Sequence, residues 1–262
     1  MFRPVSDYHM HTTFSDGKNS PRQMLERAVE LGLREVGISD HSYTPFDLSY
    51  CMEKKRIGEY NAELNALKAE FDGRIRFLAG IEQDFFSPEP TDGYDYVIGS
   101  VHYLEKNGVY APIDSDRQTL QRAIHDMYGG DPYAMCEAYF ENVSRVCERW
   151  GADIVGHIDL ITKFNEQPQG VLIDDTHPRY REAACRAVDS LLGYDAVFEI
   201  NTGAISRGVR KTPYHAPFIR DYIVSRGGKL ILSSDAHNRD WICLKFDELG
   251  DISGVVSTLG LK

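Results

Sequence analysis

Short apolar segments alternate with longer amphipathic segments along most of the chain. Seven of the short segments are rich in β-branched and aromatic residues, a composition typical of β-strands. They cover residues 5–9, 35–39, 75–82, 94–102, 153–158, 196–201 and 229–234. The pattern therefore predicts seven strands.

The segments between the strands have the periodicity of amphipathic helices. Ser20 and Pro21 have the residue types of a helix cap and a first helical position, and Gly32 is placed to end that helix. Further helices are expected at about 52–71, 132–150, 177–192 and 215–226. Strands that alternate with helices in this way predict parallel βαβ units, and hence an α/β fold.

Two segments lack a clear period. Residues 105–131 contain one short helical pattern, at about 120–127, and form a long insertion between a strand and the next helix. Residues 163–178 form a second loop of this kind. Insertions of this type often shape an active site. Because no repeat or linker divides the chain, residues 1–262 are predicted to form a single domain. A length of 262 residues is common among α/β barrels.

Composition and charge exclude several classes of function. The chain has 42% apolar residues and a formal net charge of −11, which argues against a protein that tracks the backbone of a nucleic acid. A small phosphorylated substrate needs only a local cluster of positive charge and remains compatible with this balance. No signal region and no apolar run of membrane-spanning length is present. The expectation is a cytoplasmic protein that does not bind membranes.

The cysteines are odd in number and form no CxxC motif. They predict reduced, partly buried thiols rather than disulfides, zinc thiolates or a catalytic nucleophile. The five are Cys51, Cys136, Cys147, Cys185 and Cys243.

Histidines and carboxylates gather where the predicted strands end. In a parallel barrel the carboxyl ends of all strands open onto one face, where the active site is built. These residues should therefore converge although they come from distant parts of the sequence. They are His9, His11, His41, Glu82, His102, His157, Asp235 and His237.

The spacing of His9 and His11 suits metal binding. Residues i and i+2 of an extended segment point the same way, so both imidazoles can grip one ion. Imidazole suits zinc, iron and manganese, and a carboxylate such as Glu82 or Asp235 can bridge two ions.

Each of these signals is weak when taken alone. A single HxH is often a pair of surface residues, Asp16 in FSDG has the character of a turn residue, and His102 or His157 alone would be an ordinary packed histidine. Their recurrence at strand after strand on one predicted face favours a metal cluster instead.

Six ordered motifs resemble those of the PHP family (polymerase and histidinol phosphatase). They are HMHTTFSDG, ISDHS, GIEQDF, GSVHYL, GHIDLI and SSDAH, and they run from Asp7 to His237. The sequences GSVHYL, GHIDLITKF and EINTGAISRG resemble those of the histidinol-phosphatase branch of the family. The resemblance implies a distorted seven-stranded (β/α)7 TIM-like barrel. It also implies a histidinol-phosphatase that hydrolyses L-histidinol phosphate to L-histidinol and phosphate in histidine biosynthesis.

The resemblance also implies a centre of two to three divalent transition-metal ions. The first ion would be bound by His9, His11, Glu82 and Asp235, and the second by Glu82, His102 and His157. The third would take Asp16, His41 and His237. Some family members have histidine where this chain has Asp16, and a harder oxygen ligand leaves zinc, iron and manganese all open.

Candidates for substrate contact lie near the same strand ends. Arg207, in NTGAISRG, could donate two hydrogen bonds to the phosphate, and Lys163 is a second candidate for phosphate binding. The alternative for either residue is a solvated surface cation. Asp159, or water on a metal, could protonate the leaving alkoxide. Asp235 is assigned to catalysis as well as to the metal centre. The histidines outside the motifs, expected at the surface or in packing, are His125, His177 and His215.

Two other functions remain open at this point. One is another PHP phosphoesterase that acts on nucleotides or on a DNA 3′ end, although the net charge and the lack of an aromatic-basic stripe count against DNA. The other is a non-catalytic metal-binding PHP module. The expected partner is a small phosphorylated substrate, and the sequence leaves the oligomeric state undetermined.

Overall fold

The computed structural model describes residues 4–249 and 253–261, and its core is a seven-stranded parallel sheet. All seven predicted strands are confirmed. In sheet order they are β1 (Ser6–Asp7), β2 (Glu35–Ile38), β3 (Arg76–Asp84), β4 (Tyr96–Ser100), β7 (Ile154–Val155), β8 (Val197–Asn201) and β9 (Lys229–Ser233).

The sheet curls until its first and last strands meet beyond their carboxyl ends. Met10 and Ala236 form a parallel bridge there. The backbone N–H of His11 donates to the carbonyl of Ala236 over 2.9 Å, and the N–H of Ala236 donates to the carbonyl of His9 over 3.0 Å. The predicted distorted TIM-like barrel is therefore confirmed.

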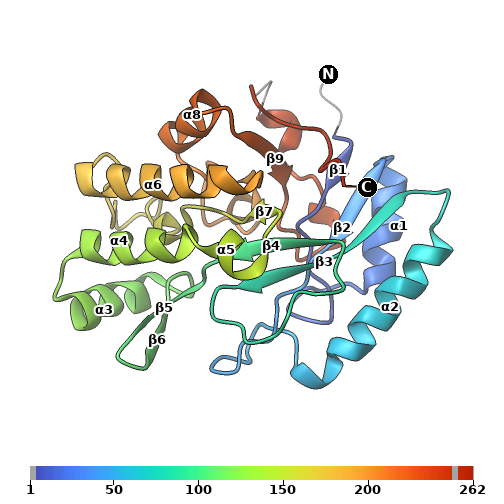
Figure 1. The fold of residues 1–262 in the computed structure, drawn as a ribbon, viewed down its shortest axis with the longest axis horizontal. Coiled ribbons are helices and arrows are strands. Elements are labelled where there is room, and N and C mark those ends of the chain that lie inside the picture. Colours follow the sequence, from blue (N-terminus) through green and yellow to red (C-terminus); the bar gives the residue numbers. More distant parts are fainter. Residues whose placement is uncertain (1–3, 250–252, 262) are drawn as a thin grey trace.

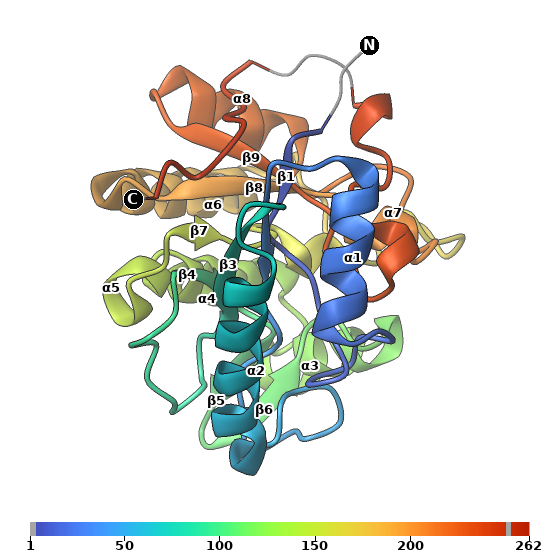
Figure 2. The ribbon, with the colours of Figure 1, turned by 90° about the vertical axis from the view of Figure 1, so that its right-hand side faces the viewer.

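Helices cover the outside of the barrel (Figures 1 and 2). Figure 1 shows α4 and α6 along one flank and α1 and α2 along the other. The α-helices are α1 (Pro21–Leu31), α2 (Ile57–Glu70), α3 (Arg117–Tyr128), α4 (Pro132–Val143), α5 (Val146–Trp150), α6 (Pro178–Leu191), α7 (Gly203–Ser206) and α8 (Pro217–Ser225). Short 3-10 turns occupy 54–56, 160–162, 192–194, 239–241 and 246–248. In the part of the chain that the structure describes, no helix is long and apolar enough to cross a membrane.

The caps of α1 follow the sequence prediction. The Ser20 hydroxyl accepts the backbone N–H of Gln23, and the Gln23 side-chain oxygen accepts the backbone N–H of Ser20. Gly32 ends the helix at a φ of 73°. The other helices differ at their ends. The segment 52–71 begins with a 3-10 turn, and α2 starts only at Ile57.

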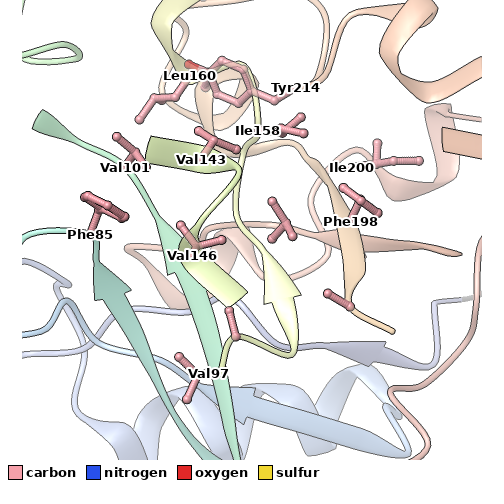
Figure 3. Packing of buried hydrophobic residues seen from close by; sticks show 14 of the residues in the cluster. Phe85, Val97, Val101, Val143, Val146, Ile158, Leu160, Phe198, Ile200 and Tyr214 are labelled. Atoms are coloured by element: carbon pink, nitrogen blue, oxygen red, sulfur yellow. The ribbon is translucent and has the colours of Figure 1, made fainter. Parts of the chain in front are cut away.

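The segment predicted as one helix over 132–150 is divided into α4 and α5. Both parts bury apolar residues against the sheet, and Figure 3 shows Val143, Val146 and Val97 among these buried side chains. Helix α5 approaches β4 so closely that a Cβ on Gly99 would lie 2.7 Å from the Cβ of Val146. A glycine is therefore required at this position of the strand.

The insertion at 105–131 has more structure than its sequence pattern indicated. It begins with an antiparallel hairpin, β5 (Tyr103–Lys106) and β6 (Val109–Pro112), and α3 is longer than the predicted 120–127. Asn107 and Gly108 join the two strands, with φ values of 55° and 79°. Asn-Gly is the residue pair that a two-residue hairpin turn favours, so the sequence itself contains the signal for this hairpin.

The carboxyl-terminal segment closes the opposite end of the barrel. Leu230 pairs with Val255, and the hydroxyl of Ser6 donates to the carbonyl of Ser257 over 2.6 Å. Leu259 packs on the apolar cluster at this end of the barrel and donates its N–H to the hydroxyl of Tyr8. All five cysteines are free, as predicted.

Candidate metal centre

The nine residues expected to bind metal converge on one end of the barrel. They fall into four overlapping groups, and within each group the possible ligand atoms lie within 4.8 Å of one another. The groups are His11, Asp16, His41 and His237; His9, His11 and Asp235; His9, Glu82 and His157; and His41, Glu82 and His102. The predicted convergence is confirmed, whereas the role of each residue as a ligand remains a prediction.

Glu82 lies at the middle of this set. Its strand, β3, continues two residues beyond it, so its side chain points into the barrel rather than from the strand end. Its Oε2 faces the ring nitrogens of His9 (3.3 Å), His11 (3.6 Å) and His41 (2.6 Å), and its Oε1 faces those of His102 (3.4 Å) and His157 (3.1 Å). The two oxygens therefore serve two different sets of imidazoles.

The electrostatics of the centre favour positive charge around Glu82. Burial opposes ionisation of this carboxyl, but the imidazoles of His41 and His9 outweigh burial and hold its pKa well below the ordinary value. Burial likewise opposes a charged His102, yet Glu82 raises the pKa of that imidazole well above its usual range. A divalent cation would supply the charge that these groups otherwise obtain from protons.

Several polar atoms of the centre are buried without a hydrogen-bond partner. A buried polar group left unpaired costs about 1–3 kcal/mol, so such a concentration of them needs an explanation. Metal coordination explains it, because imidazole nitrogens and carboxylate oxygens are the usual donors to transition-metal ions. The atoms are His9 Nε2, His11 Nδ1 and Nε2, and His157 Nδ1. A metal would account for His9 Nε2 and for one nitrogen of His11, whereas His157 turns its other nitrogen, Nε2, towards Glu82.

Two carboxylates that the sequence reading missed orient the histidines. Glu199 Oε1 lies 2.7 Å from His9 Nδ1, which leaves the Nε2 of that ring to face the centre. Asp84 Oδ2 lies 3.2 Å from His102 Nδ1 in the same way. A partner on one ring nitrogen fixes the tautomer and rotation of a metal-binding histidine. The available signal was a charged residue inside an apolar strand, as in VFEIN for Glu199.

Asp16 completes the group at the outer edge. Its Oδ1 lies 3.2 Å from His237 Nε2 and 3.7 Å from His41 Nε2. Because His41 is closer to Glu82 than to Asp16, it stands between the implied second and third ion sites rather than in the third alone. The turn before Asp16 is fastened by Asp40, which accepts the N–H groups of Thr12 and Ser15.

Asp235 connects the histidines to an arginine. Its Oδ1 lies 3.2 Å from His11 Nε2, and its Oδ2 accepts a hydrogen bond of 2.9 Å from Arg207. A Cβ on Gly203, in α7, would lie 2.6 Å from Asp235 Oδ2. The arginine that follows α7 reaches the centre because this glycine allows the close approach.

A cavity of about 260 Å³ opens over the centre. Both predicted cations, Arg207 and Lys163, line it together with most of the metal-binding candidates. The ammonium of Lys163 lies 2.9 Å from the carboxylate of Asp114, a lining residue that the sequence reading missed. Lys163 and the imidazoles of His102 and His157 overcome burial and lower the pKa of Asp114 to about 2.

Asp159 does not take the place expected of it. Its side chain is fully buried, does not line the cavity, and accepts the backbone N–H of Ala216 over 2.8 Å. From there it holds the segment before α8. The histidines outside the motifs lie away from the centre as expected: His125 is exposed on α3, His177 caps α6, and His215 is buried.

The chain matches the family model described as "PHP domain" over residues 7–203. A probable histidinol-phosphatase of Deinococcus radiodurans is 30% identical over 95% of this chain and 94% of its own length.

Two solved structures share the fold. The putative histidinol phosphatase hisK of Listeria monocytogenes superposes with a TM-score of 0.78 at 21% identity, over 93% of this chain and 99% of the other. Histidinol phosphate phosphatase of Lactococcus lactis subsp. lactis, complexed with zinc, L-histidinol and phosphate, superposes with a TM-score of 0.64 at 23% identity, over 90% and 87%.

Proposed function

The chain belongs to the PHP domain family, and from that premise we propose that it is a metal-dependent histidinol-phosphatase, which hydrolyses L-histidinol phosphate to L-histidinol and phosphate. The observation that carries the proposal is the cluster of nine imidazoles and carboxylates, six of which line the cavity together with Arg207 and Lys163. A relative that covers nearly the whole chain supports the same substrate.

Two to three ions of zinc, iron or manganese would occupy the centre. One would be held by His9, His11, Glu82 and Asp235, a second by Glu82, His102 and His157, and a third by Asp16, His41 and His237. When bound, such ions neutralise phosphoryl oxygens and activate water near neutral pH, which a slow phosphomonoester hydrolysis requires.

The chain's own residues position the phosphate. Arg207 projects from beyond α7 into the cavity, and Asp235 orients its guanidinium through the hydrogen bond of 2.9 Å. Burial opposes the charge of Arg207, but Asp235 overcomes it and raises the pKa of the guanidinium above its usual value. The planar donors of arginine fit two phosphoryl oxygens at once, and Lys163, which lines the same cavity, adds a point charge.

Phosphate release from a panel of phosphomonoesters tests the proposal directly. L-histidinol phosphate should be hydrolysed with a kcat/KM well above that of nucleoside monophosphates and of an oligonucleotide with a 3′ phosphate. Preference for a nucleotide would assign the chain to another PHP phosphoesterase activity. Release from none of them, with metal bound, would indicate a non-catalytic module.

Protein purified without chelator should carry two to three transition-metal ions per chain. The expectation follows from nine donor residues in overlapping groups, with Glu82 positioned to serve two ions. Elemental analysis of active protein measures the ratio. A value of one or less in fully active protein contradicts the assignment of three ion sites.

Arg207→Ala should lower kcat/KM for L-histidinol phosphate and leave the metal content unchanged. Loss of one charged group that stabilises the transferring phosphoryl is worth about 2–4 kcal/mol, or roughly 30- to 1000-fold. Arg207→Lys should recover only part of the activity, because a point charge lacks the planar fork.

Arg186→Ala, on the exposed face of α6, is the matched control and should behave as wild type. Steady-state kinetics paired with metal analysis measure all three variants. Wild-type kcat/KM in Arg207→Ala would return this residue to an ordinary surface role.

A further inference from the structure

One wall of the cavity is acidic and aromatic rather than basic. It carries Asp47, Tyr50 and Tyr103, and it belongs to the same cavity as Arg207 and Lys163. The cavity therefore offers both signs of charge: its metal-binding residues and Arg207 suit a phosphate, whereas Asp47 suits a positive group.

Asp47 is the carboxylate of this wall that is free to bind a cation. Its Oδ2 accepts a hydrogen bond of 2.7 Å from the Tyr103 hydroxyl, and its Oδ1 accepts the N–H and hydroxyl of Ser49. No lysine, arginine or histidine within residues 4–249 and 253–261 pairs with it. Asp114, by contrast, is already neutralised by Lys163 at 2.9 Å.

The fold holds Asp47 in place. Its neighbour Phe46 stacks on Tyr110 of β6, with ring centroids 3.8 Å apart and planes inclined by 9°. Phe46 also meets Tyr103 of β5 edge to face at 4.9 Å. The β5–β6 hairpin therefore fixes the loop that carries Asp47. Burial is outweighed by the hydrogen bonds from Ser49 and Tyr103, which lower the pKa of Asp47 and keep it ionised.

We propose that Asp47 binds the protonated amine of the substrate, so that the cavity selects phosphomonoesters with an ammonium group beside the phosphate-bearing carbon. The proposal rests on the proposed function, because L-histidinol phosphate carries its ammonium on the carbon next to the CH2–O–P group. Asp47 would then be a specificity residue, distinct from the residues that hold metal and phosphate.

The test compares L-histidinol phosphate with its des-amino analogue, 3-(imidazol-4-yl)propyl phosphate. In Asp47→Asn, kcat/KM for L-histidinol phosphate should fall roughly 10- to 100-fold, mainly through KM, since a charge-assisted hydrogen bond is lost. The analogue should change by less than about threefold, because it never made this contact. Metal content should be unchanged, and activity on the analogue shows that the variant is folded.

Asp126→Asn removes the same charge from an exposed position on α3 and is the matched control. It should leave both substrates unaffected, which separates a local contact from a change in net charge. Tyr103→Phe keeps the Asp47 charge but removes its phenolic donor, and it should raise KM for L-histidinol phosphate by a smaller factor.

An equal loss on both substrates in Asp47→Asn, or no loss on either, overturns the assignment of Asp47. Wild-type enzyme that hydrolyses both substrates equally well also overturns it, yet leaves the proposed phosphatase activity standing. Wild-type enzyme that hydrolyses another phosphomonoester but not L-histidinol phosphate overturns the proposed function itself.

Discussion

Glu82→Ala should lose its metal and lower kcat/KM by at least roughly 1000-fold, because the carboxylate that contacts both sets of imidazoles disappears. Without it, His9, His41 and His157 lose the one carboxylate that all three contact. Elemental analysis and phosphate release on the same preparation measure both losses.

Two further variants make this result specific. Glu82→Gln keeps the shape of the side chain but not its charge, so a similar loss of metal would assign the effect to the carboxylate. His125→Ala, which removes an exposed imidazole from α3, should retain metal and activity. Near-normal turnover in Glu82→Ala would refute the central place given to this residue.

Chelation should abolish activity and lower Tm by roughly 8–16 °C. An ion present at 1000 times its Kd stabilises the folded state by about 4 kcal/mol, and each kcal/mol moves Tm by roughly 2–4 °C in a domain of this size. The stabilisation is expected here because candidate ligands come from both ends of the sheet, from His9 after β1 to His237 after β9. Differential scanning calorimetry with and without chelator measures the shift.

The Glu82→Ala protein is the control for this experiment, since chelation should leave its Tm nearly unchanged. Readdition of zinc or manganese should restore both the Tm and the activity of the wild type. An unchanged Tm in wild-type protein shown to be metal-free would mean that the ions do not hold the barrel together.

The residue pattern predicted the parallel α/β order and the meeting of eight candidate ligands because both follow from one regularity, whereas the resemblance to the PHP family supplied the closed barrel and Asp16. Apolar runs marked the strands, and polar residues at their carboxyl ends must share one face in a parallel barrel. Gly203 and Glu199 were missed because their roles depend on contacts with residues that are distant in the sequence. The partner of His9, for example, lies 190 positions away, and no local pattern encodes that pairing.

Asp159 illustrates the limit within a single motif. It follows His157 by two residues, and an extended chain would point both side chains the same way. The backbone instead turns into a 3-10 segment at Leu160–Thr162, so the carboxylate faces Ala216 while the imidazole faces the centre. The direction of a side chain depends on the backbone conformation, and the hydrophobic periodicity of residues 153–158 does not predict the turn that follows them.

The closure of the barrel by its two ends has a consequence for the order of synthesis. Ser6 cannot form its hydrogen bond until Ser257, 251 positions later in the chain, has been synthesised. At a translation rate of about 5–20 residues per second, that interval is on the order of 10 to 50 seconds. During this time β1 has neither Ala236 nor the carboxyl-terminal segment beside it. The barrel therefore cannot close, and the full set of candidate metal ligands cannot assemble, until the segment from Asp235 to Ser257 has been synthesised.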